Sequence, residues 1–295
     1  MTMTMFGGYH PSVLMFYFLS VLCVAMFAAN PILEVIALLG GILFLIMIQK
    51  HSEVPGEAGF YIPMFIIIAL TNPLFSHNGV TPLFFMNGNP VTLEAFIYGI
   101  FIAVTVIGVM MWCKCYSCIM TSDKFLYLFG KAVPKLSLVL SMALRFVPMF
   151  KRRMRRVNCA QRAMGLYSSG GYTDRIRSAM RVFTAMISWS LESAMDTSAS
   201  MKARGYGYVK RSNFSIYRFC ADDGVLLTVS AAMLIIVLVG IATGQMTYYY
   251  YPRLGGLNPA PCALLVYVGF GILSFMPFFI EVKGALLWKY YISKI

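Results

Sequence analysis

The sequence predicts an all-α, polytopic membrane protein with about six transmembrane helices and a cytoplasmic pair of long crossed helices between spans four and five. The first observation is composition: 59% of the 295 residues are hydrophobic and the mean hydropathy is +0.74, far above the values of soluble domains. The second is the placement of charge. Residues 113–218 hold 19 Lys or Arg and 4 Asp or Glu, whereas the remaining residues hold 5 and 7. One basic block therefore separates two apolar parts of the chain.

Six apolar runs are long enough to be read as membrane helices, and turn or cap signals separate several of them. Asn30-Pro31 ends the first helix and starts the second, and Thr92 followed by Glu94 predicts the start of the fourth. The runs are residues 13–29, 32–48, 60–75, 95–112, 225–243 and 263–280.

The distribution of Lys and Arg between these runs predicts the orientation of the chain. Lys50, the basic block and three lysines after the last run fall on one side, whereas Arg253 falls on the other. Positive residues favour the cytoplasm, so we expect both termini and the block to be cytoplasmic. Residues 76–93 contain no Lys or Arg and are expected to form an outward loop, in which short helices around 80–86 would add a re-entrant element.

Inside the block, the pattern predicts a short helix over residues 123–130 and two long helices after it. Pro134 suits the first position of a helix that runs to Met164. Thr173 as N-cap and Asp174 in the first turn predict a second helix that continues to about Arg204.

Apolar residues recur at helical spacing along both long helices, and we expect the two helices to cross on these faces. The expected faces are Val139, Ala143, Val147, Phe150, Met154, Val157 and Met164 on the first helix, and Ile176, Met180, Phe183, Ile187, Ala194, Ser198 and Met201 on the second. The chain then divides into four spans over 1–112, a cytoplasmic helix region over 113–222, and two spans with a cytoplasmic tail over 223–295.

The two long helices end in similar tripeptides, Ala163-Met164-Gly165 and Ala203-Arg204-Gly205. A glycine just past a helix commonly adopts the left-handed conformation that closes the last turn, so the simplest interpretation is a pair of ordinary helix C-caps. An arginine at such an end also suits the negative end of the helix dipole without any partner. The duplication of the tripeptide about 40 residues apart favours a function for both ends.

Five stretches give the chain a family resemblance: TNPLFSHNG at 71–79, VTLEA at 91–95, ALRFVPMF at 143–150, AQRAMG at 160–165 and MKARGYG at 201–207. With them the chain resembles the transmembrane T component of energy-coupling factor (ECF) transporters. In these importers T joins two ABC ATPases to a separate, membrane-embedded substrate-binding S protein. The resemblance implies a non-catalytic subunit for uptake of a vitamin or other micronutrient across the plasma membrane of a prokaryote. It also implies that ATP and Mg are bound by the partner ATPases and that T itself holds no cofactor.

In the family that the chain resembles, Ala-Arg-Gly motifs at the ends of two coupling helices dock into grooves on the two ATPases. The second motif is intact here as Ala203, Arg204 and Gly205. The first is changed, because Met164 stands between Ala163 and Gly165 where an arginine is expected. Arg162 is the nearest cation, but two residues turn through about 200° on a helix, so it points away from position 164. The alternative is that one groove accepts methionine, which packs adaptably.

The first long helix has more apolar positions in its first half than one buried face requires. We expect the surplus to face the S protein. The residues assigned to this surface are Leu136, Leu140, Leu144, Phe146 and Phe150.

The sequence supports three other functions less well. An intramembrane enzyme acting on a phosphorylated substrate at a basic cytoplasmic cleft needs converging acids or a nucleophile with its base, and the block holds four acids and no histidine. Nucleic-acid binding would need aromatic residues among the cations, and KRRMRR at 151–156 has none, so the bilayer is the expected partner of that cluster. Cys113, Cys115 and Cys118 lack a fourth ligand nearby, so no metal site is predicted.

Overall fold

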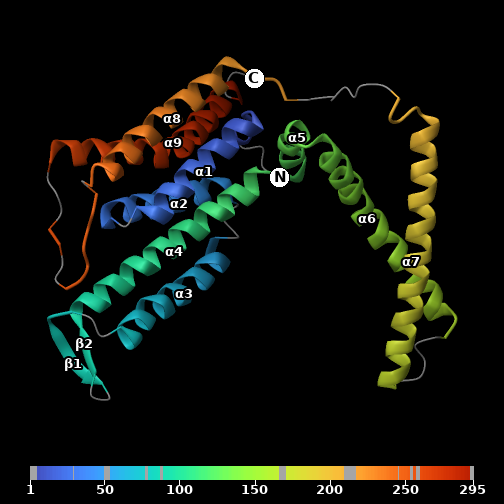
Figure 1. Ribbon diagram of the computed structural model, residues 1–295, viewed down its shortest axis with the longest axis horizontal. Helices are drawn as coiled ribbons and strands as arrows, with labels where there is room; N and C mark the ends of the chain where they lie inside the picture. Colours follow the sequence, from blue (N-terminus) through green and yellow to red (C-terminus); the bar gives the residue numbers. More distant parts are fainter. Residues whose placement is uncertain are drawn as a thin grey trace. The chain divides into compact units, whose positions relative to one another are not determined.

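The computed structural model describes residues 5–28, 30–49, 54–76, 79–86, 89–165, 171–208, 217–244, 246–252, 255–256 and 260–292. The chain forms two compact units. Unit 1 comprises Met1–Lys124 and Tyr217–Ile295, and unit 2 comprises Phe125–Ile216. Figure 1 shows the helices of both units.

Unit 1 is a bundle of apolar helices (Figure 1). The helix α4 packs against α1, α2 and α3, while α9 packs against α2 and α8. Its members are the short 3-10 helix η1 (Phe6–Gly8) and the α-helices α1 (Pro11–Phe27), α2 (Pro31–Ile48), α3 (Val54–Phe75), α4 (Leu93–Ile119), α8 (Ala221–Ala242) and α9 (Pro261–Ile292).

Four of these helices, α2, α4, α8 and α9, are long and apolar enough to cross a membrane, and α1 and the segment Gly59–Phe75 of α3 are shorter apolar helices. The expectation of an all-helical polytopic membrane protein is therefore confirmed. Cap residues begin two helices as expected: Asn30 accepts from the Ile32 N–H and Thr92 from the Ala95 N–H.

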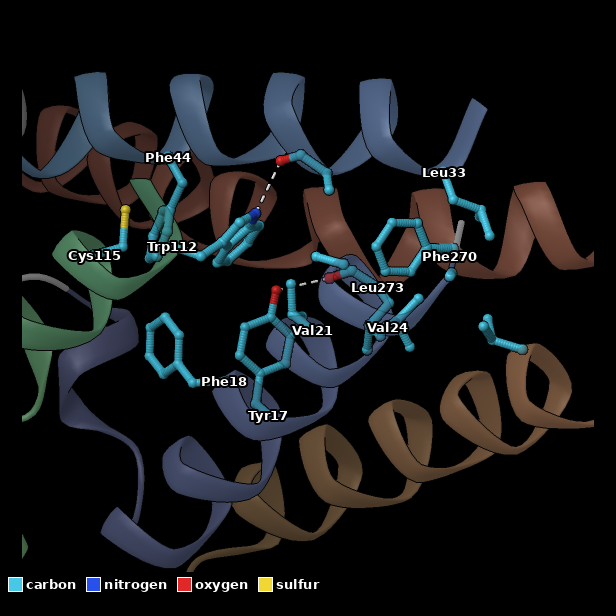
Figure 2. Packing of buried hydrophobic residues seen from close by; sticks show 14 of the residues in the cluster. Tyr17, Phe18, Val21, Val24, Leu33, Phe44, Trp112, Cys115, Phe270 and Leu273 are labelled. Atoms are coloured by element: carbon cyan, nitrogen blue, oxygen red, sulfur yellow. Dashed lines mark hydrogen bonds between the residues drawn. The ribbon is translucent and has the colours of Figure 1, made fainter. Parts of the chain in front are cut away.

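An aromatic cluster forms part of the core of unit 1, shown in Figure 2. Trp112 of α4 is fully buried and its indole N–H donates to the Ala37 carbonyl of α2 at 2.9 Å. Tyr17 of α1 donates to the Leu273 carbonyl of α9 at 2.7 Å. Since a buried Trp or Tyr needs a partner for its polar atom, one bond ties α4 to α2 and the other ties α1 to α9.

Small residues let α2 and α9 approach closely. A side chain at Gly40 would collide with the Ser274 hydroxyl, which itself donates to the Ile36 carbonyl at 3.3 Å. Such contacts between small residues are a usual way in which helices associate in membranes, where burial of apolar surface between helices gains little.

The prediction of short helices around residues 80–86 is wrong. This segment is the strand β1 (Pro82–Met86), which pairs antiparallel with β2 (Asn89–Thr92). Residues 87 and 88 between the strands read Asn-Gly in the sequence, the dipeptide that two-residue hairpin turns favour most. That signal, together with Phe84 and Phe85, outweighs any helical tendency of so short a run.

Unit 2 contains most of α5 (Ser122–Ala132) and the two long helices α6 (Pro134–Ala163) and α7 (Tyr172–Ala203). Pro134 is at the start of α6, as predicted. Asp174 lies in the first turn of α7, but the expected N-cap Thr173 is inside the helix and Gly171 is the N-cap. Gly171 in an extended conformation serves there without a side-chain bond.

The two long helices pack together only partly on the faces that periodicity predicted: Phe150 of the predicted α6 face meets Trp189, with ring centroids 6.5 Å apart. Phe146 stacks on Trp189 with ring centroids 5.4 Å apart, and Arg153 places its guanidinium 5.7 Å from the centre of the same indole. On α7 the buried residues are Ser178, Val182 and Met186. Several residues of the predicted faces are exposed instead: Val139, Val147, Met154, Ile176, Met180, Phe183 and Ile187.

Candidate functional site

The ends of α6 and α7 have nearly the same backbone conformation. Met164 is the C-cap of α6 with φ −82° and ψ 7°, and Arg204 is the C-cap of α7 with φ −82° and ψ 9°. The next residues, Gly165 and Gly205, have φ of 76° and 78°. This left-handed conformation costs any residue with a Cβ, which explains why glycine occupies both positions. The prediction of glycine-closed ends is confirmed.

The hydrogen bonds of the two ends also correspond. Gly165 N–H donates to the Arg162 carbonyl and Gly205 N–H to the Lys202 carbonyl, both at 3.0 Å. At the end of α7 the Tyr206 N–H adds a bond to the Met201 carbonyl at 3.1 Å, which completes a Schellman motif. Backbone N–H groups thus satisfy the carbonyls of Ser200, Met201 and Lys202, so these three acceptors do not need the Arg204 side chain.

The side chains at both ends are exposed. Ala163, Met164, Ala203 and Arg204 all lie on the surface of unit 2, and a Cβ added at Gly205 would meet no atom within 4 Å. The predicted docking residues therefore form two open tips with one backbone shape. They differ in side chain, since one tip carries a methionine that is 66% exposed and the other an arginine.

Arg162 lies in the last turn of α6 and is exposed. Because it is still within the helix while Met164 is its C-cap, Arg162 leaves the helix in a different direction from the tip. Its side chain is thus not positioned as Arg204 is, and Met164 is the positional equivalent of Arg204.

A groove of about 720 Å³ lies between α6 and α7. Its wall is mostly apolar, with Phe146 and Met149 from α6 and Met201 from α7. Lys202 and Tyr206 also line it, so the groove extends to the turn that carries Arg204. A contact in this groove would touch both long helices and the second tip together.

The five residues assigned to the S protein fall into two groups. Leu136 and Leu144 are 52% and 40% exposed, and Leu140 is half-buried. The ring centroids of Phe146 and Phe150 lie 5.4 and 6.5 Å from that of Trp189, so both residues belong to the contact between α6 and α7. The assignment stays a prediction, with the three leucines as its more accessible part.

Sequence reasoning missed a stripe of exposed apolar residues on α7. It had placed the first four of them in the helix crossing, because periodicity identifies an apolar face without saying what covers it. Spacings of three and four put all of them on one side of the helix. The stripe is Ile176, Met180, Phe183, Ile187, Leu191 and Met195, and these residues are 42% to 68% exposed.

Comparison with known proteins shows the family of the chain. The model of a family described as "Cobalt transport protein", CbiQ, matches residues 8–216, a range that includes both tips. The energy-coupling factor transporter transmembrane protein EcfT of Staphylococcus aureus (strain 04-02981) is 28% identical over 244 residues, which cover 77% of this chain and 88% of that protein.

Two further relatives match over shorter stretches. EcfT of Listeria innocua is 34% identical over 104 residues, 35% of this chain and 39% of the relative. EcfT of Lactobacillus helveticus is 32% identical over 120 residues, 40% and 42% of the two chains. Proteins of this family are transporter components and not enzymes, which removes the alternative of an intramembrane enzyme. The chain belongs to the CbiQ family and is an EcfT-like transmembrane component of an energy-coupling factor transporter.

Proposed function

We propose that the chain couples two cytoplasmic ABC ATPases to a membrane-embedded S protein that binds a vitamin or another micronutrient. The observation that carries the proposal is the pair of exposed tips with one backbone conformation at the ends of α6 and α7. Two tips with the same backbone conformation suit two homologous partners. ATP and Mg belong to those ATPases in this proposal, because the sequence has no GxxxxGK[ST] loop of its own.

Each tip has a defined role. Arg204 enters a groove on one ATPase, where its planar guanidinium can make two parallel bonds to a carboxylate. Met164 enters the corresponding groove on the other ATPase through apolar contact. Arg162 is the alternative residue for the first ATPase contact. Its side chain leaves the helix in a different direction from that of Met164, so it is the less suitable of the two. The unequal tips suit two ATPases that differ at the docking groove.

The exposed apolar stripe of α7, together with Leu136, Leu140 and Leu144 of α6, supplies the surface for the S protein. Neither long helix is among those apolar enough to cross a membrane within the residues that the structure describes. Their exposed apolar side chains therefore suit a protein surface or the membrane interface better than the bilayer core. Both termini and unit 2 are placed in the cytoplasm of a prokaryotic cell, on the basis of the lysines and arginines.

The first test is Arg204→Glu in the full chain, co-expressed with its cognate ABC ATPases and purified in detergent. Loss of a charge-assisted contact and introduction of a like charge against a carboxylate should remove one ATPase from the complex. Arg181→Glu, an exposed position within α7, is the matched control and should leave the complex intact. Recovery of both ATPases with Arg204→Glu at the wild-type ratio would contradict the docking role.

The second test concerns the altered tip. If one ATPase groove is fitted to methionine, Met164→Arg brings a cation into an apolar site and should lower recovery of that ATPase while the other stays bound. Arg162→Ala should have little effect in the same assay. The reverse result, with loss at Arg162→Ala and none at Met164→Arg, would move the first contact to Arg162.

A further inference from the structure

The described N-terminal segment, residues 5–10, is held by α9. The Met5 and Phe6 N–H groups donate to the two carboxylate oxygens of Glu281 at 3.2 and 2.8 Å. Phe6 is fully buried and meets the ring of Phe44 edge-on, with centroids 5.6 Å apart. This segment is thus an integral part of unit 1 and is fixed against the last helix of the chain.

A buried lysine ties the same segment to the point where the chain leaves unit 1. Lys124 is the last residue of the first part of unit 1 and is 8% exposed. Its ammonium donates to the Gly7 carbonyl at 2.6 Å and to the Ile119 carbonyl, at the end of α4, at 3.1 Å. Burial lowers the pKa of Lys124. A buried cation held by carbonyl oxygens is costly, which points to a role for its position.

A buried aspartate ties the segment to the point where the chain returns. Asp223, in the first turn of α8, is 4% exposed. One carboxylate oxygen accepts from the His10 N–H at 2.7 Å and the other from the Cys220 N–H at 2.8 Å. The carboxylate therefore caps α8 and holds the N-terminal segment at once.

The exit and the return of the chain are close to each other. The rings of His10 and Phe219 lie with centroids 5.5 Å apart, so the returning chain contacts the same segment that Lys124 binds. The pKa of Tyr217, the first residue after unit 2, is raised by burial and then by the charge of Asp123. Burial and the charges of Asp222 and Asp223 likewise raise the pKa of Tyr9. Residues 5–10, 119–124 and 217–223 thus meet in one place.

We infer that residues 5–10 form an anchor that joins both ends of the inserted segment 125–216 to the membrane bundle, with Lys124 and Asp223 as its positioning residues. The inference rests on the proposed function. Segment 125–216 is joined to the rest of the chain covalently only at its two ends. Motion that the ATPases impose on α6 and α7 can therefore pass along the chain only through those ends. Because both ends are bound to one anchor, they move the bundle together. Without the anchor, local flexibility at the two connections would take up the motion before it reached the bundle.

Hydrogen exchange measured by mass spectrometry on the purified full chain tests the anchor itself. Lys124→Met should speed exchange of residues 5–10 and 119–124 by about tenfold or more, the effect expected on losing bonds to a charged group. Asp223→Ala should do the same for residues 5–10 and 217–223. Exposed residues of the same charge outside the anchor supply the controls: Lys283→Met and Glu192→Ala should leave these rates unchanged. Equal rates in the wild type and both anchor variants would overturn the anchor.

The assembled complex with the ATPases tests transmission. In the wild type, ATP with Mg should change exchange in α7 and also at residues 217–223. In Lys124→Met the change in α7 should persist and the change at 217–223 should be lost, with the ATPases still bound. Transmission in the variant equal to that in the wild type would refute the positioning role. If the wild type binds no ATPase, the proposed function fails, and the exchange rates of the chain alone still decide whether the anchor exists.

Discussion

Unit 1 and unit 2 bury their apolar residues in opposite ways. The core cluster of buried hydrophobic residues belongs entirely to unit 1, and it includes the large rings Phe6, Tyr17, Phe44 and Trp112. In unit 2, α6 has no buried residue, and the buried residues of α7 are Ser178, Val182 and Met186. The bundle is packed against itself, whereas the helix pair directs much of its apolar surface outward. Exposed apolar surface of this kind is suited to binding other proteins.

The comparison predicts that the largest loss of stability comes from the bundle. Trp112→Ala removes a fully buried ring and its indole bond to the Ala37 carbonyl, which should cost about 3–5 kcal/mol. Thermal unfolding in detergent, followed by circular dichroism, measures the change. Trp288→Ala is the control, because Trp288 is 69% exposed on α9 and its loss should leave the melting temperature close to that of the wild type. Equal effects would mean that the bundle is not organised around Trp112.

A smaller effect is expected where the two long helices touch. Trp189→Ala removes the stacking with Phe146 and the contact with the Arg153 guanidinium, worth about 0.5–1.5 kcal/mol for an aromatic pair beyond its buried area. Hydrogen exchange in α6 and α7 should rise while α2 and α4 stay protected. If exchange rose in both units, the two would not be independent in stability.

The helix ends should respond alike. Gly165→Ala and Gly205→Ala each place a Cβ on a backbone with φ near 77°, which should cost about 1 kcal/mol at either tip. Exchange at the last turns of α6 and α7 reports the loss, and Gly256→Ala, with open space for a Cβ, is a control. A clear difference between the two tips would break their structural equivalence and leave sequence similarity alone to relate them.

The smallest effect on the chain itself is expected at the exposed stripe of α7. Phe183→Ser removes a ring that is 58% exposed, so stability of the isolated protein should stay within about 0.5 kcal/mol of the wild type. Under the proposed function, the same change should lower recovery of the co-expressed S protein, while Thr184→Ala, at an exposed neighbouring position, should not. If Phe183→Ser and other stripe variants retained the S protein, the stripe would not be its binding surface.

The parts of the structure that sequence alone predicted are those with a local cause. Apolar run length predicted the membrane helices, Pro134 marked the start of α6, and Gly165 and Gly205 marked the closed ends. The crossing of α6 and α7 was predicted less well, because each helix has more than one apolar stripe and periodicity cannot say which stripe its neighbour covers. Trp189, the residue at the centre of that crossing, has polar neighbours on either side in the sequence.

The anchor contacts were beyond the reach of sequence reasoning for a different reason. Lys124 and Asp223 look like ordinary polar residues at helix starts, and their partners Gly7 and His10 are far away along the chain. The partners contribute backbone groups, so no side-chain motif marks them. The docking roles of Met164 and Arg204 came from resemblance, and the backbone geometry adds that the two positions are equivalent.

The hydrogen bond between Tyr17 and the Leu273 carbonyl has a consequence for how the protein is made. The two residues are 256 positions apart, so α1 leaves the ribosome well before α9. At a synthesis rate of roughly 5–20 residues per second, the phenol waits for tens of seconds before its acceptor exists. The early helices must therefore remain in an unfinished arrangement inside the bilayer or its insertion machinery, and the bundle closes only after α9 has been synthesised.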